Sequence, residues 1–375
     1  MDNSDYSDGK KPRHTLGGSE NIYEILGSGT EAEMNPVGPP KPDPGMPSRF
    51  YTPFTLMLLF SIINVINYLD RGALAALLNV LREEFDLSHE AAGAVSSVFM
   101  VGYMTTSVVF AVLANVVKPN ILVSTGLTTW CIAVLATAGA LNYPMLLIAR
   151  AFVGVGEASF ITLAPVFIDD YAPLKVKNIY LAVFYIALPV GTAIGYLYGG
   201  VVGYLLDWRV AFLGEAFIMA PFVVCVVFIP PLKKHDSKAA AMFKSLRGIL
   251  IMFYRLISNP LFDLMSFGYA MFTFSVGALL VWGVTYITTV LHLDLLIASA
   301  MFSILSLVSG IIGTALGGLV VDFAGRYFER FKNPMTIFVC VILVAAAIPF
   351  GFAAVWTDSA IFFFALITVF TTLLL

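Results

Sequence analysis

Long apolar stretches separated by short polar segments dominate the chain after its first fifty residues. Crossing the hydrocarbon core of a bilayer, about 30 Å, takes about 20 consecutive apolar residues in a helix. Stretches of this kind cover residues 52–79, 91–116, 120–140, 144–168, 178–204, 210–230, 261–288, 297–321, 334–356 and 359–375. The pattern therefore predicts an all-α protein that crosses a membrane ten times.

The composition supports this interpretation, because 59% of the 375 residues are hydrophobic and only 12% are charged. An average soluble domain contains about 25% charged residues. The formal net charge of −3 gives no reason to expect a nucleic-acid partner. We therefore expect an integral, multi-pass protein whose surroundings are the lipid bilayer.

Polar segments divide the chain into four predicted parts. Residues 1–50 are polar and rich in proline toward their end, which predicts a disordered cytosolic tail. Six spans follow in residues 51–231 and form a first membrane domain. A basic cytosolic linker, residues 232–259, then leads to a partial second domain of four spans, residues 260–375.

Lysine and arginine are concentrated in alternate loops, and cytosolic loops of membrane proteins carry the excess of these residues. One side has only Arg82 and Arg209. The opposite side carries Lys118, Lys175, Lys177, Lys233, Lys234, Lys238, Lys244, Arg247, Arg255, Arg326, Arg330 and Lys332. This asymmetry predicts a cytosolic N-terminus.

The loop after the eighth predicted span reads "GGLVVDFAGRY", in which Gly318, Asp322, Gly325 and Arg326 follow the pattern Gly-x-x-x-Asp-x-x-Gly-Arg. This loop resembles the one that follows the second span in each half of the major facilitator superfamily, whose parallel halves are a known transporter plan. The equivalent loop after the second span, "FAVLANVVKPN", departs from the pattern because Asn115 occupies the position of the acid. We interpret Asp322, Gly325 and Arg326 as part of a cytosolic gate.

Two further acids, Asp169 and Asp170, lie at the expected cytosolic end of the fourth span and are assigned to the same gate. A solvated helix end is the alternative. Four spans leave the second half short of the six helices that close each bundle of this fold. We therefore expect two further spans beyond this sequence; a true ten-span protein is the alternative.

Five ionisable residues fall inside the predicted spans, where such groups are costly and usually face a cavity or a partner. They are Asp70, Arg71, Arg150, Glu157 and Glu215. At about 1.5 Å per helical residue, Asp70 lies roughly 14 Å below the outer surface, Arg150 about 9 Å and Glu157 about 20 Å. Glu215 is only about five residues into the sixth span by the same scale, so we expect it to be an interfacial or scaffold carboxylate.

Arg150 and Glu157 are two helical turns apart and share a helix face, whereas the neighbours Asp70 and Arg71 point about 100° apart. We therefore expect each charge of the adjacent pair to find a partner on another helix, with the fourth span offering a base and an acid. Burial and a nearby guanidinium have opposite effects on the protonation of a carboxylate, so such a cluster suits proton coupling. A static network that only fixes helix register is the alternative.

Signals of catalysis are absent from the sequence. The segment "GVGEAS" superficially resembles a dinucleotide-binding turn, but it lies in the middle of a span with no preceding strand. The chain has no H-E-x-x-H, Walker or G-x-S-x-G motif and no Cys or His pair at metal-binding spacing. We expect neither an enzyme nor a cofactor or metal.

Four stretches together resemble the Spinster group of the major facilitator superfamily: "INYLDR", "RAFVGVGEASF", "FYIALPVGTAIGY" and "DWRVAFLGEA". The segments "FIDDYAP" and "YGGVVG" are most similar to its plant-type members. The resemblance implies a twelve-span carrier of lysophospholipids and sphingolipids such as sphingosine phosphate, in late endosomal, lysosomal, mitochondrial inner or plasma membranes. It also implies proton coupling through Asp70 and Glu157 and a charged cavity network that includes Arg71 and Arg150.

We therefore predict an alternating-access transporter of a single-chain, phosphate-bearing lipid, coupled to protons. Glu157 is the expected main protonation site and Asp70 an assisting one, while Arg150 and Arg71 hold these carboxylates or bind the headgroup. The tyrosines expected along the cavity are Tyr68, Tyr185 and Tyr196.

Two other functions stay open at this point. A facilitator for a small polar solute or organic anion would have more hydrogen-bonding side chains along its cavity, whereas the spans contain few Asn, Gln or Arg. A non-transporting scaffold or receptor derived from a carrier is compatible with the altered loop at Asn115 and the four-span second half. Nothing in the sequence indicates an oligomeric state.

Overall fold

The computed structural model of this chain describes most of its apolar part. The described ranges are 52–114, 116–173, 175–229, 253–254, 256–327, 332–357 and 359–374. The expected tail, most of the expected basic linker and Asn115 lie outside these residues. The division into domains stays a prediction.

Ten long helices account for most of the described residues, among which no strand is present. They are α2 (Pro53–Glu84), α3 (His89–Leu113), α4 (Pro119–Ala138), α5 (Tyr143–Tyr171), α6 (Lys177–Leu205), α7 (Trp208–Val227), α10 (Pro260–Thr289), α11 (Leu295–Tyr327), α12 (Lys332–Val355) and α13 (Ala360–Leu374). Each helix coincides with one expected span, which confirms the all-α fold class.

Eight of these helices are long and apolar enough to cross a membrane by length and composition, namely α2 to α7, α10 and α11. In α12 and α13, the apolar segments within the described residues are shorter, Ala345–Val355 and Ala360–Leu373. Full-length spans are therefore confirmed for eight of the ten expected positions in the part of the chain that the structure covers.

Polar caps fix the starting points of α5 and α7. Asn142 accepts a hydrogen bond from the backbone N–H of Met145 (3.0 Å), and Asp207 accepts one from Arg209 (2.8 Å). Such caps provide partners for N–H groups that the first turn of a helix leaves unpaired. The Arg209 side chain also donates to the carbonyl oxygen of Ala140 (3.3 Å), so both helices begin at the same end of the bundle.

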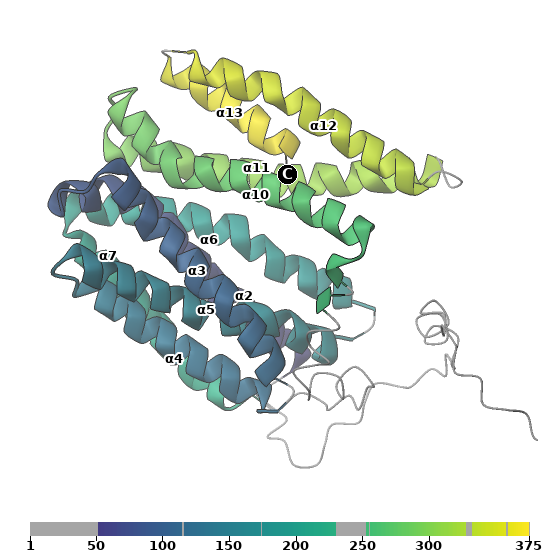
Figure 1. The fold of residues 1–375 in the computed structure, drawn as a ribbon, viewed down its shortest axis with the longest axis horizontal. Coiled ribbons are helices and arrows are strands. Elements are labelled where there is room, and N and C mark those ends of the chain that lie inside the picture. Colours follow the sequence, from purple (N-terminus) through teal and green to yellow (C-terminus); the bar gives the residue numbers. More distant parts are fainter. Residues whose placement is uncertain are drawn as a thin grey trace, which may run out of the picture. The chain divides into compact units, whose positions relative to one another are not determined.

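Glycines allow α2 and α6 to pack with their backbones close together. A Cβ atom at Gly195 would lie 2.2 Å from the carbonyl oxygen of Leu69, and one at Gly72 would lie 2.3 Å from that of Thr192. Small residues at such contacts are the usual means of close helix packing in membranes. Figure 1 shows α6 running between α2 and α11, and it contacts both.

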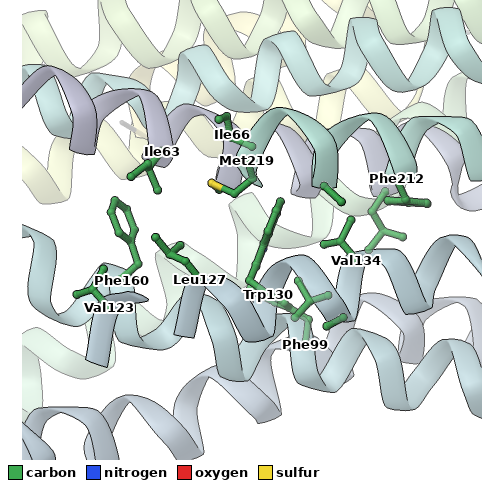
Figure 2. Close-up of a cluster of buried hydrophobic side chains, with 14 of the residues drawn as sticks. Ile63, Ile66, Phe99, Val123, Leu127, Trp130, Val134, Phe160, Phe212 and Met219 are labelled. Carbon is green, nitrogen blue, oxygen red and sulfur yellow. The ribbon is translucent and has the colours of Figure 1, made fainter. Parts of the chain in front are cut away.

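Large apolar side chains fill the interior between α2, α4, α5 and α7. Figure 2 shows Trp130 of α4 reaching toward Met219 of α7, with Phe212 farther along the same helix. All three side chains are buried. Phe212 and Met219 are seven residues apart and therefore lie on one face of α7, so this face points into the bundle.

A second apolar cluster joins α2 and α6 to the later helices. Tyr196 of α6 packs against Phe302 of α11 with ring centroids 5.6 Å apart, and Ser306 donates to the carbonyl oxygen of Pro189 at 3.2 Å. These contacts hold α6 and α11 side by side.

The close contact at Gly195 predicts a stability effect. Gly195→Ala should lower the free energy of unfolding by about 1–3 kcal/mol, because the added methyl group meets backbone atoms that cannot move aside without separating α2 from α6. Reversible unfolding in mixed micelles titrated with a denaturing detergent measures it. Gly277→Ala is the matched control, since among the described residues no atom beyond its own turns of α10 lies within 4 Å of the added Cβ there. Equal stability of the two variants would contradict the packing described.

Candidate functional site

An ion pair buried between α2 and α5 forms the centre of the site. Nη1 of Arg150 donates to both carboxylate oxygens of Asp70, at 2.9 Å each. Neither side chain is measurably open to solvent, with 0% and 1% exposed. Each charge therefore depends on the other for compensation in a medium where an isolated ion is costly.

A second ion pair links the same two helices with the charges reversed, so that the arginine is on α2 and the carboxylate is on α5. Nη2 of Arg71 donates to Oε1 of Glu157 at 2.6 Å. Glu157 is fully buried, whereas 25% of the Arg71 side chain is exposed. The second pair is therefore accessible to solvent only through the arginine side chain.

Aromatic rings surround the Arg71 guanidinium. Its Cζ lies 4.8 Å from the ring centroid of Tyr68, 4.7 Å from that of Phe99 and 5.9 Å from that of Tyr103. A cation within about 6 Å of an aromatic face is attracted by the ring quadrupole. The arginine is thus held by α2 and α3 as well as by its carboxylate partner on α5.

Helix geometry explains how adjacent residues of α2 serve two separate pairs. Arg150 and Glu157 are seven residues apart, about 10 Å along α5, whereas Asp70 and Arg71 are separated by about 1.5 Å along α2. Each pair consists of a long arginine and a shorter carboxylate, so the arginines span the difference. The expected meeting of these four residues across helices is present.

Several polar atoms in these pairs have no hydrogen-bond partner among the described residues. They are Nε of Arg71, Nε and Nη2 of Arg150, and Oε2 of Glu157. The Arg150 guanidinium also lies over the ring of Phe212 on α7, with Cζ 4.4 Å from the ring centroid. Both pairs therefore retain donors and an acceptor that a ligand, a water molecule or a rearranged side chain can use.

Glu215, expected as an interfacial or scaffold carboxylate, is a buried neighbour of the ion pairs. It is fully buried on α7, and its charged neighbours in the described structure are Asp70 and Arg150. Helix α7 begins at Trp208, two residues before the expected span. Glu215 is seven residues beyond that start, and Arg150 is seven residues beyond the start of α5 at Tyr143. Because α5 and α7 begin at the same end of the bundle, this equal spacing could have indicated that Glu215 and Arg150 lie at the same height.

The three expected cavity tyrosines lie in different surroundings. Tyr68 is half-buried beside Arg71, whereas Tyr185 is 57% exposed on α6. Tyr196 is fully buried, and its hydroxyl donates to the carbonyl oxygen of Leu280 on α10. Only Tyr68 contacts the charged residues, and Tyr196 instead joins α6 to the later helices.

The expected gate residues lie at helix ends. Asp169, near the end of α5, forms an ion pair with Lys177 at the start of α6, and Asp170 follows it in the same last turn. Asp322, Gly325 and Arg326 fall in the last turns of α11, and their side chains lie outside the described part of the structure. Their role as a gate stays a prediction.

A groove of about 650 Å³ lies between α4 and α5, apart from the ion pairs. Its lining is mostly apolar and consists of Thr129, Ile132, Ala133, Ala136, Asn142, Pro144, Met145, Ile148, Ala149 and Phe152. Within the described ranges, no group of three or more His, Cys, Asp or Glu side chains could hold a metal ion.

Comparisons with known proteins identify the family of this chain. A family model described as Major Facilitator Superfamily matches residues 60–375. The chain is 32% identical over 367 residues to "Probable sphingolipid transporter spinster homolog 2" of Arabidopsis thaliana, across 88% of this chain and 74% of that protein. It is 35% identical over 322 residues to "Probable sphingolipid transporter spinster homolog 3" of the same plant, across 73% and 62%. A crystal structure of a bacterial homolog of the human lysosomal transporter Spinster, inward-facing and unoccupied, matches with a TM-score of 0.72 at 19% identity, across 86% of this chain and 72% of that one.

The buried pair predicts a measurable coupling between Asp70 and Arg150. A double-mutant cycle of Asp70→Asn and Arg150→Met should give a coupling energy of about 1–3 kcal/mol in unfolding free energy, because the two side chains compensate each other. The exposed pair is the control: Asp169→Asn with Lys177→Met should give about 0.5 kcal/mol or less. Detergent unfolding measures both cycles, and equal coupling in the two would contradict the buried contact.

Proposed function

The chain belongs to the Spinster family of the major facilitator superfamily, and from this we propose that it carries a single-chain, phosphate-bearing lipid across a membrane together with protons. Members of this superfamily are membrane transporters and not enzymes. The lipid class is the one that the plant relatives' names describe, sphingolipids. The proton coupling rests on the charges of this chain.

One observation carries the proposal: the Arg71–Glu157 pair is buried on its acidic side and accessible on its basic side. Guanidinium groups bind phosphate through two parallel hydrogen bonds. Part of the Arg71 side chain is exposed, so an arriving phosphate that reaches the guanidinium would compete with Glu157 for its N–H groups. The phosphate of the headgroup and the Glu157 carboxylate therefore compete for the Arg71 guanidinium.

The same competition links the lipid to a proton. When phosphate takes Arg71, Glu157 is left as a buried carboxylate without its cation, and such a charge is costly inside a membrane. Uptake of one proton by Glu157 removes that charge. Binding of the anionic lipid and binding of the proton then favour each other, which is a coupling free energy between two ligands.

The surroundings of Arg71 favour a lipid over a small polar solute. The rings of Tyr68, Phe99 and Tyr103 border the guanidinium and offer apolar surface to a chain attached to the phosphate. Helix α3, which supplies Phe99 and Tyr103, also exposes Met100, Val101 and Met104. An acyl or sphingoid chain can lie along such a surface while its headgroup reaches Arg71.

Transport would proceed by rocking of two halves around this site, as in other carriers built from repeats. In this scheme the N-terminus lies in the cytosol, and Asp169, Asp170 and the Asp322 loop form the cytosolic gate. Late endosomal, lysosomal, mitochondrial inner and plasma membranes are all compatible with it.

Loss of the carboxylate tests the coupling. In proteoliposomes with an imposed pH gradient, Glu157→Gln should lower uptake of labelled sphingosine phosphate by on the order of tenfold, equivalent to about 1.4 kcal/mol, and should remove its dependence on the gradient. Glu83→Gln, an exposed acid at the end of α2, is the control and should transport as the parent does. Full gradient dependence in Glu157→Gln would remove this residue from the mechanism.

Replacement of the cation tests the headgroup contact. Arg71→Lys keeps the charge but loses the planar fork, so the apparent KM for sphingosine phosphate should rise by on the order of tenfold, about 1.4 kcal/mol of binding. Sphingosine, which has no phosphate, should bind to both forms equally. The measurement is uptake at varied lipid concentration; the same increase for both lipids would contradict a phosphate contact, and faster uptake of a labelled hexose than of either lipid would favour a polar-solute carrier.

A further inference from the structure

The buried charges of the site do not balance. Asp70, Arg71, Arg150, Glu157 and Glu215, which we call the five-residue cluster, contain two guanidinium groups and three carboxyl groups. With every group ionised the cluster would carry a net charge of −1 (2 − 3). A net charge at membrane depth is costly, and one bound proton makes the cluster neutral.

The hydrogen bonds identify the carboxyl group that is left over. Asp70 and Glu157 each accept from an arginine at 2.6–2.9 Å. Glu215 is fully buried and forms no ion pair with an arginine in the described structure; its carboxyl group lies against that of Asp70. The unbalanced charge therefore lies at Glu215.

Glu215 faces the Asp70–Arg150 pair. It lies three residues after Phe212 and four before Met219, on the α7 face that points into the bundle, as the direction of these two side chains in Figure 2 shows. The Arg150 guanidinium lies over the Phe212 ring at 4.4 Å. Arg150 uses only Nη1 for Asp70, and its Nε and Nη2 are unpartnered among the described side chains.

The other polar groups around Glu215 do not supply a compensating charge. From α6, Tyr198 interacts with it electrostatically, but the Tyr198 hydroxyl donates to the carbonyl oxygen of Ala211 at 2.8 Å. Asp70 on α2 is acidic, and Arg150 on α5 is already paired.

We propose that Glu215 is a second proton carrier of this transporter: it holds the cluster's proton in this conformation and passes it to Asp70 when Arg150 exchanges one carboxylate for the other. In that exchange the O–H bond of Glu215 breaks and an O–H bond forms on Asp70. The Arg150 guanidinium simultaneously leaves the Asp70 carboxylate and pairs with that of Glu215. One cation, one carboxylate and one carboxylic acid are present before and after, so the step moves a proton from α7 to α2 without changing the buried charge.

This inference rests on the proposed function for its role in transport, whereas the protonation of Glu215 can be measured without transport. Infrared difference spectroscopy of the full chain in liposomes detects the C=O stretch of a protonated, buried carboxyl group. The parent protein should show such a band at neutral pH. Glu215→Gln, which has the volume and neutrality of the protonated acid, should lose it, while Glu157→Gln and Glu83→Gln should keep it. A band that persists in Glu215→Gln, or no band in the parent, would overturn the inference.

A second variant distinguishes loss of the carboxyl group from misfolding of the protein. Glu215→Asp retains a carboxyl group and should keep the band at a shifted frequency, and detergent unfolding establishes that each variant is folded. Loss of the band in a folded Glu215→Asp protein would also contradict the proposal, because the carboxyl group is still present.

Transport distinguishes the relay from the wider proposal. If sphingosine phosphate uptake depends on the pH gradient in the parent and keeps that dependence in Glu215→Gln, the relay is overturned and the proposed function stands. If the parent shows no such uptake but Glu215→Gln abolishes the band, the proposed function fails and the proton on Glu215 stands. Loss of the band together with a loss of gradient dependence of at least severalfold supports both.

Discussion

An ion inside a bilayer needs a counter-ion within reach, and this requirement organises the first six described helices. Asp70 and Arg71 compel α5 to present Arg150 and Glu157 to α2, because leaving any of the four alone would expose a charge to a medium that does not solvate it. The glycines at the α2–α6 contact bring the helices close enough for α2 to be enclosed. Packing and charge pairing thus act on the same helix, one setting its distance from its neighbours and the other its register.

The two pairs differ in what surrounds them, and this difference separates their roles. Asp70 and Arg150 are sealed among apolar side chains, with Phe212 beneath the guanidinium. Arg71 is partly exposed and bordered by aromatic rings. The sealed pair borders only groups inside the bundle, of which Glu215 is one. The accessible pair can also respond to a molecule that enters from outside it.

Much of the fold was predictable, because apolar length alone identifies a membrane helix and helical periodicity alone shows that Asp70 and Arg71 diverge. The partner of each charge was not predictable from the sequence. Arg150 and Glu157 are about 10 Å apart along α5, so the pairing depends on how far each arginine side chain reaches. The contact of Glu215 with the Asp70–Arg150 pair was not predictable, because sequence spacing does not show that α7 packs beside Arg150. The partner of the Tyr196 hydroxyl was not predictable for a similar reason: it depends on the packing of α6 against α10.

The consecutive placement of Asp70 and Arg71 on one unbroken helix has a mechanical consequence. Helix α2 runs without interruption from Pro53 to Glu84, so the two residues move as a single rigid unit. A tilt or rotation of this rod therefore strains both ion pairs at once. Any movement of α2 is felt at the sealed pair and at the accessible pair together.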